Sequence, residues 1–151
     1  MDLLQAMQER HSVRSYSSKP IEGDAKEKLS SFIAQCNAES GLHIQLVLNE
    51  ANAFDGTMAH YGKFTGVRNY IVMAGMAGKK AASLEETCGY YGEKIVLYAQ
   101  TLGLNTCWVA MTYSKGKAVF QPFLRPAGCL SFSAATCKSW TKERRVLHTR
   151  L

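Results

Sequence analysis

The strongest constraint on the fold is a helical repeat in the second half of the chain. Ser83-Leu-Glu-Glu86 has the spacing of a capping box, in which two side chains accept hydrogen bonds from each other's backbone N–H groups. Gly103 is a typical helix stop. Between them, apolar residues recur at alternating steps of four and three, at Leu84, Cys88, Tyr91, Ile95, Tyr98 and Leu102. The pattern predicts a helix over residues 84–102 that packs along its length against another helix, which in a chain this short can belong to a second subunit.

Two further helices and three strands are predicted. Residues 2–10 form a short helix, and Asp24-Ala-Lys-Glu27, a variant capping box, opens a second helix that ends at Gly41. The apolar stripe of the second helix is Leu29, Phe32, Ile33 and Cys36. The strands are predicted at residues 42–48, 70–74 and 105–111. Helices that alternate with apolar strands indicate an α/β or α+β fold.

The composition fits one folded domain over residues 1–151. The chain is 46% hydrophobic and 20% charged, and no repeat or low-complexity linker marks a boundary. No apolar stretch is long enough to span a bilayer or to form a signal peptide. The five cysteines are odd in number and lack a C-x-x-C pair, which favours reduced thiols. We therefore expect a cytoplasmic protein without a membrane partner.

The net charge of +6 is concentrated at the C-terminal end. Residues 138–151 contain five basic residues and one acidic residue. A nucleic-acid-binding surface combines basic stripes with aromatic platforms, and a basic tail alone favours such a surface only weakly. No nucleic-acid partner is expected, although a basic module that binds nucleic acid through this tail is one alternative function.

One short segment concentrates groups that bind anions. The chain has no dinucleotide-binding glycine motif, P-loop, H-E-x-x-H or nucleophile elbow, and its four histidines are scattered, so we expect no metal site. In Arg10-His11-Ser12-Val13-Arg14, an extended backbone would place Arg10, Ser12 and Arg14 on one side and Val13 towards the protein. Two guanidinium groups and a hydroxyl suit a phosphate. The equally weighted alternative is that both arginines face solvent and complement the C-terminal dipole of the preceding helix.

Three segments, in the same order along the chain, resemble the nitroreductase family. Arg10-His-Ser-Val-Arg-Ser-Tyr16, followed by Pro20, is similar to the family's N-terminal flavin-phosphate motif. Gly92-Glu-Lys-Ile-Val-Leu-Tyr-Ala-Gln-Thr-Leu-Gly-Leu-Asn-Thr-Cys-Trp108 resembles its central helix and the G-L-G-T-C-W strand that follows. Lys63-Phe-Thr-Gly-Val-Arg-Asn-Tyr-Ile71 is similar to the stretch before the middle strand. The resemblance covers roughly residues 1–120.

This resemblance implies an α+β fold of three layers. Helices would flank a central, mainly antiparallel sheet, and the long central helix would lie at a homodimer interface. The family binds FMN at that interface, and NADH or NADPH reduces the flavin. The reduced flavin then passes electrons to nitroaromatic compounds, quinones or related acceptors in a ping-pong cycle. The sequence does not discriminate between NADH and NADPH or among the acceptors.

The resemblance also assigns cofactor-binding residues by motif. Arg10, Ser12 and Arg14 would hold the phosphate, the ribityl chain or the pyrimidine edge of FMN, and His11 occupies a position that is basic in the family. Further contacts are implied for Phe64, Thr65, Asn69, Thr106, Trp108, Val109 and Ala110. No catalytic side chain is implied, because the flavin performs the chemistry and a backbone N–H near Val109 or Ala110 would approach its N5 atom. Plain core packing is the alternative for the Trp108 side chain.

The resemblance fades after Val119. Residues 121–151 form an atypical tail, for which one hypothesis is translation outside the family's reading frame. The tail would then be partly disordered or would contribute to the FMN site. An alternative function for the whole chain is a flavin carrier or sensor without significant turnover.

Overall fold

The computed structural model describes residues 1–57, 61–75, 81–109, 112–114, 117–119 and 133–139, with only the backbone at 81–83 and 133–139. Four antiparallel strands form one sheet in the order β1-β2-β4-β3. These strands are β1 (His43–Val47), β2 (Tyr70–Ala74), β3 (Leu104–Val109) and β4 (Ser133–Ser139). Every residue of β2 is buried, as its continuous apolar run predicts for an inner strand.

The strand β4 lies in the segment that the sequence marks as an atypical tail. It pairs with β2 on one side and with β3 on the other, so the two predicted inner strands do not pair with each other. No strand was predicted here. The more distal residues 140–151, which carry most of the basic tail, lie outside the described residues.

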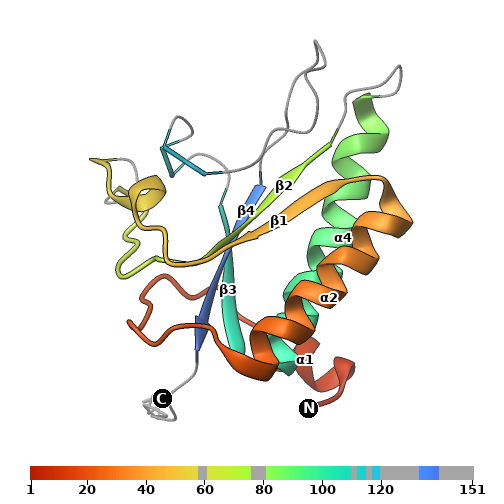
Figure 1. Ribbon diagram of the computed structural model, residues 1–151, viewed down its shortest axis with the longest axis horizontal. Coiled ribbons are helices and arrows are strands. Elements are labelled where there is room, and N and C mark those ends of the chain that lie inside the picture. The colour runs from red at the N-terminus through yellow and green to blue at the C-terminus, as the bar shows by residue number, and fades with distance from the viewer. Residues whose placement is uncertain (58–60, 76–80, 110–111, 115–116, 120–132, 140–151) are drawn as a thin grey trace, which may run out of the picture.

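Two long helices cover one face of the sheet (Figure 1). They are α2 (Gly23–Ser40) and α4 (Ala81–Thr101), and the shorter α1 (Leu3–Glu9) packs against α4. The predicted seam of α4 faces inward in the same chain, where Cys88 and Ile95 belong to the core and Tyr98 stacks on Phe32 of α2. The seam therefore has a helix partner within the protomer, while its Leu84, Tyr91, Tyr98 and Leu102 stay partly exposed.

The opposite face of the sheet is covered by the segment between β1 and β2. This segment includes the 3-10 helix η1 (Asn52–Phe54). A second apolar cluster forms there around Phe54, Phe64, Tyr70, Val109 and Tyr113. The molecule therefore has a helix layer, an antiparallel sheet and an aromatic loop layer, which confirms the expected α+β class.

The predicted helix ends are right at the C-termini and wrong at the N-termini. Gly41 and Gly103 adopt the left-handed conformation, with φ values of 70° and 77°, where the two long helices stop. Asp24 and Ser83 lie inside their helices, and Asp24 forms an ion pair with Lys28 at 3.0 Å instead of capping. The capping box occurs in α1, where Asp2 and Gln5 exchange hydrogen bonds.

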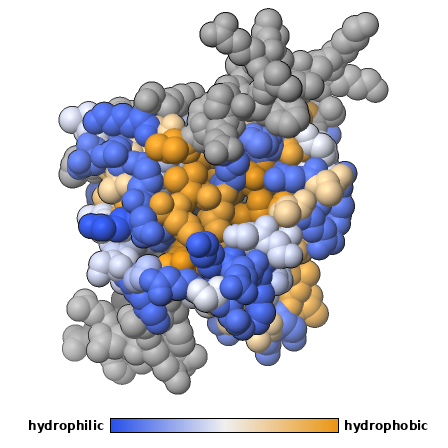
Figure 2. All heavy atoms as spheres, in the orientation of Figure 1, coloured by the Kyte–Doolittle hydropathy of each residue, from blue (hydrophilic) through white to orange (hydrophobic). Residues whose placement is uncertain are grey.

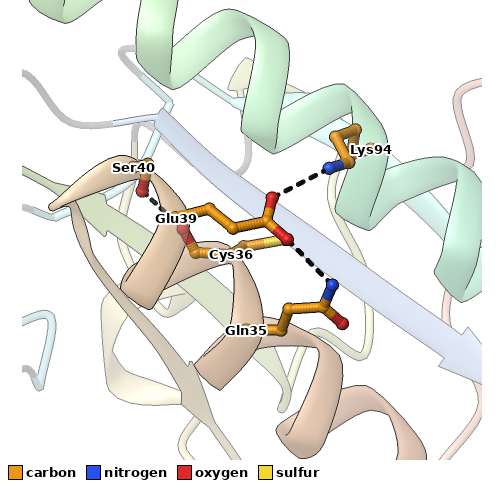
Figure 3. A network of polar contacts seen from close by, with 5 residues as sticks. All are labelled: Gln35, Cys36, Glu39, Ser40 and Lys94. Carbon is orange, nitrogen blue, oxygen red and sulfur yellow. Dashed lines mark hydrogen bonds and ion pairs between the residues drawn. The ribbon is translucent and has the colours of Figure 1, made fainter.

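A polar contact joins the two long helices at the surface (Figure 3). The Glu39 carboxylate of α2 lies 3.2 Å from Nζ of Lys94 in α4 and accepts a 2.8 Å hydrogen bond from Gln35. The Lys94 ammonium also lies 5.1 Å from the centre of the Tyr91 ring. The bond from Gln35 and the contact with Lys94 lower the pKa of Glu39, and Glu39 raises the pKa of Lys94.

Candidate functional site

Residues 10–16, here called the arginine strip, are extended and held between two parts of the fold. The Val13 N–H donates to the Thr106 carbonyl of β3 at 3.1 Å. On the other side, the Thr65 N–H donates to the Arg14 carbonyl at 3.0 Å, and the Tyr16 N–H donates to the Thr65 carbonyl at 2.9 Å. Ser15 and Thr65 form a parallel bridge. The strip therefore lies along the outer edge of β3. There it contacts the other two segments that resemble the nitroreductase family, one through Thr65 and the other through Thr106.

Arg10 is fixed where α1 ends. Its backbone N–H donates to the Ala6 carbonyl at 2.9 Å, and its side chain is only 19% exposed. The Arg10 Nε lies 3.4 Å from Oε1 of Glu93 in α4. Its Nη1 atom is buried and has no hydrogen-bond partner in the described part of the chain. This arrangement excludes, for Arg10, the alternative of a solvent-facing arginine.

The Glu93 carboxylate also binds Trp108, at the far end of its own sequence motif. Its Oε2 accepts a 2.9 Å hydrogen bond from Nε1 of Trp108 in β3. The neighbouring Gly92 makes room for the indole, because a Cβ at that position would overlap the Trp108 ring and the Met73 sulfur. Arg10, Glu93 and Trp108 thus form one polar chain from α1 through α4 to β3.

The other residues of the strip are more open. Ser12 and Arg14 are exposed, and the Arg14 guanidinium lies 6.0 Å from the centre of the buried Phe64 ring. His11 is exposed, with Nδ1 lying 3.0 Å from the Glu9 carbonyl. Val13 is half-buried, as the alternation predicts. The strip therefore carries exposed donors at positions 12 and 14, and a buried, unpartnered nitrogen on Arg10.

The remaining predicted site residues have different environments. Thr65 contributes its backbone to the strip, whereas Asn69 is 7% exposed and its Oδ1 accepts a hydrogen bond from the Asn49 N–H at 3.0 Å. Thr106 is buried, with no partner for Oγ1 among the described residues, and Val109 is buried in the second apolar cluster. Ala110 lies outside the described residues.

Sequence reasoning missed two acidic residues with structural roles. Glu93 was quoted only as part of a helix motif, and no local pattern marked its role, because its two partners come from other elements. Glu50 accepts a 2.7 Å hydrogen bond from the Tyr70 hydroxyl, which itself accepts one from the Val119 N–H at 2.9 Å. Burial and the Glu50 contact raise the pKa of Tyr70.

An apolar cavity of about 450 Å³ lies between the three helices. The apolar side chains of α1 that line it are exposed, with Leu3 at 51% and Met7 at 53%. A different hydrophobic surface, ringed by hydrophilic residues, lies at the centre of the face drawn in Figure 2, where Figure 1 shows the strands. Exposed apolar patches of this kind are typical of surfaces that bind another protein or a ligand.

The described residues contain no cluster of three or more potential metal ligands. None of the helices in the described ranges has the length and apolar character of a membrane span.

Comparison with known proteins identifies the family. The family model described as "Putative TM nitroreductase" matches residues 2–136. The chain belongs to the nitroreductase family. The match to the nitroreductase model extends through part of β4, so the expected end of the resemblance at Val119 was too early. Among curated proteins, none matches this nitroreductase-family chain in sequence.

Solved nitroreductases have the same fold. An FMN-dependent nitroreductase from Clostridium difficile R20291 superposes with a TM-score of 0.66 at 15% identity, over 93% of this chain and 89% of that one. A nitroreductase with bound FMN from Bacteroides fragilis gives a TM-score of 0.62 at 17% identity, over 100% and 97% of the two chains. A nitroreductase family protein from Clostridium novyi gives 0.63 at 19% identity, over 92% and 85%. The resemblance that the sequence motifs suggested is therefore confirmed for family and fold.

Proposed function

We propose that this chain is an FMN-dependent oxidoreductase. It uses NADH or NADPH to reduce nitroaromatic compounds, quinones or related acceptors in a ping-pong cycle. Membership of the nitroreductase family supports this proposal, as does the FMN bound in the Bacteroides fragilis relative.

The buried Nη1 atom of Arg10 is the observation that carries the proposal. A buried guanidinium nitrogen without a partner loses the hydration of a charged donor, which is costly unless an acceptor occupies the site. The neighbouring Ser12 hydroxyl and Arg14 guanidinium are exposed and available. Two guanidinium groups and a hydroxyl complement the charge and the acceptor oxygens of a phosphate, so the chemistry of the donor set fits the anionic end of FMN.

The proposed cofactor contacts follow the strip and its neighbours. Arg10, Ser12 and Arg14 bind the phosphate, the ribityl chain or the pyrimidine edge. His11 adds a polar group at the same end, and the remaining contacts come from Phe64, Thr65, Asn69, Thr106, Trp108, Val109 and Ala110. Asn69 already binds the Asn49 N–H through Oδ1, so its part is to offer the other end of the amide.

The protein's contribution is to hold and tune the cofactor. When bound, FMN supplies a ring that accepts a hydride from the nicotinamide and returns electrons to the acceptor. The Arg14 cation favours negative charge that develops nearby, and the buried β3 backbone presents fixed dipoles in a site of reduced hydration. A backbone N–H near Val109 or Ala110 would approach the flavin N5 atom, so no side chain has to gain or lose a proton there.

The proposal includes a homodimer with FMN at the subunit interface. The exposed Leu4 and Met7 of α1 and the adjoining apolar cavity supply apolar area for a second copy to cover. The interface would use α1 and the neighbouring face of α4, including Tyr98 of the seam, which lines this cavity. Cys36, Cys88 and Cys107 are free thiols, which favours a reducing, cytoplasmic location.

An absorbance spectrum of the purified protein, with and without added FMN, tests the cofactor assignment. A flavin band that anaerobic NADH or NADPH bleaches supports the oxidoreductase, and light scattering should give the mass of a dimer. Tight FMN binding without reduction by either nicotinamide would instead favour the flavin carrier or sensor. A colourless protein that takes up no FMN would contradict both.

A further inference from the structure

We propose that Glu93 is a positioning residue for the anion-binding arginine. It holds the Arg10 guanidinium by its Nε edge and so leaves Nη1 for the cofactor phosphate. This inference rests on the proposed function, because it assigns Glu93 a role at the same site.

The geometry divides the carboxylate between two partners. Oε1 lies 3.4 Å from Arg10 Nε, and Oε2 accepts the 2.9 Å hydrogen bond from Trp108 Nε1. The Trp108 bond fixes the rotation of the carboxylate, since the indole is itself held against Gly92. Nε is the guanidinium nitrogen nearest the side-chain stem, so a contact there fixes the direction of the far nitrogens.

The charge of Glu93, taken alone, predicts weaker FMN binding, which is the opposite of what a positioning role predicts. A carboxylate near a phosphate repels it, so if Glu93 acted only through space its removal would strengthen FMN binding. Glu93 is 43% exposed, which weakens such repulsion by solvent screening. If Glu93 instead holds Arg10 in place, its removal must weaken FMN binding. The sign of the change therefore distinguishes the two roles.

Glu93→Gln is the sharpest variant. The glutamine carbonyl still accepts the bond from Trp108, whereas its amide group cannot accept from Arg10 Nε. Glu86→Gln is the matched control, because Glu86 is exposed on the same helix, seven positions earlier and therefore on the same helix face. Both variants lose the same charge, and thermal unfolding verifies that each remains folded.

The readout is the ratio of affinities for FMN and for riboflavin, which lacks the phosphate. We expect Glu93→Gln to raise the FMN dissociation constant about tenfold, as loss of one oriented charged hydrogen bond predicts, and to change riboflavin binding less than about twofold. Glu86→Gln should change neither. In an Arg10→Ala background, Glu93→Gln should cause no further loss of FMN affinity, because the residue that it positions is absent.

The outcomes separate this inference from the proposed function. Wild-type binding of FMN together with unchanged or tighter binding by Glu93→Gln overturns the positioning role alone. An equal loss for FMN and riboflavin also overturns it, because the defect then lies outside the phosphate contact. Failure of the wild-type protein to bind either flavin overturns the cofactor assignment and this inference with it.

Discussion

Gly66 lies against the backbone of Tyr16, so closely that a Cβ at position 66 would overlap the Tyr16 carbonyl oxygen. Gly66 also has a φ of 69°, in the left-handed region that residues with a Cβ seldom adopt. Both features occur where the loop before β2 runs beside the arginine strip. The strip therefore owes its position partly to the absence of a side chain on its neighbour.

Replacement of Gly66 by alanine should destabilise the protein by more than ~2 kcal/mol. About 1–2 kcal/mol comes from the left-handed backbone, and the overlap with the Tyr16 carbonyl adds to it. Urea unfolding provides the measurement. Gly41→Ala is the control, since Gly41 has a similar φ of 70° with nothing near its missing Cβ, and should lose only the backbone part. Equal losses in the two variants would contradict the close contact.

The two arginines of the strip should both matter for FMN. We expect Arg10→Ala and Arg14→Ala each to weaken FMN binding by roughly 1.5–3 kcal/mol, the usual range for hydrogen bonds to charged groups. Quenching of flavin fluorescence during titration measures the change. Lys26→Ala, which removes an exposed cation from α2, should leave the affinity unaltered. Unchanged affinity in both arginine variants would refute the phosphate assignment.

Two glycines of α4 should respond oppositely to alanine. Gly89 has open space around its missing Cβ, so Gly89→Ala should raise the free energy of unfolding by about 0.5–1 kcal/mol through helix propensity. A Cβ at Gly92 would overlap the Trp108 ring, so Gly92→Ala should lower it by about 1–3 kcal/mol. Thermal or urea unfolding of the pair checks the prediction. Stabilisation by Gly92→Ala would mean that the indole does not pack on α4 as described.

The contact between Glu39 and Lys94 should stabilise the fold in a pH-dependent way. The pKa of Glu39 is lowered from its ordinary value of 4.5, so its contribution is present above that value and is lost as pH falls through the lowered pKa. The difference in unfolding free energy between wild type and Glu39→Gln should therefore shrink on acidification from about pH 7 to about pH 3. Urea unfolding at the two pH values measures it.

Glu27→Gln serves as the reference for Glu39→Gln, because it removes an exposed carboxylate from the same helix. A wild-type advantage over Glu39→Gln that stays constant across this pH range would show that the carboxylate charge is not involved.

Local patterns predicted the elements better than their partners. An extended strip was expected to turn Ser12 and Arg14 away from Val13, because side-chain direction in a strand depends only on sequence parity. Ser12 and Arg14 are exposed and Val13 is half-buried, as expected. The heptad-like spacing in α4 correctly indicated a buried seam. It did not indicate that α2 of the same chain covers the seam, because periodicity defines a face and not its neighbour.

Long-range pairing explains what the sequence could not predict. The segment Ser133–Ser139 has few bulky apolar residues, and it becomes a strand because the free edges of β2 and β3 both pair with it. Glu93 gave no local sign of its role, since its two partners come from α1 and β3. The capping-box motifs at Asp24 and Ser83 failed because each helix already includes these residues.

The backbone bond between Val13 and Thr106 joins segments that are far apart in the chain. Contacts of this kind form late in folding, because closing a long loop costs entropy that only the finished contact offsets. A nascent chain still attached to the ribosome therefore lacks the β3 edge that holds the arginine strip until β3 has emerged, although the strip is among the first residues made. Ligands of the strip consequently act as stabilisers of the completed protein only, and they give no help to early intermediates.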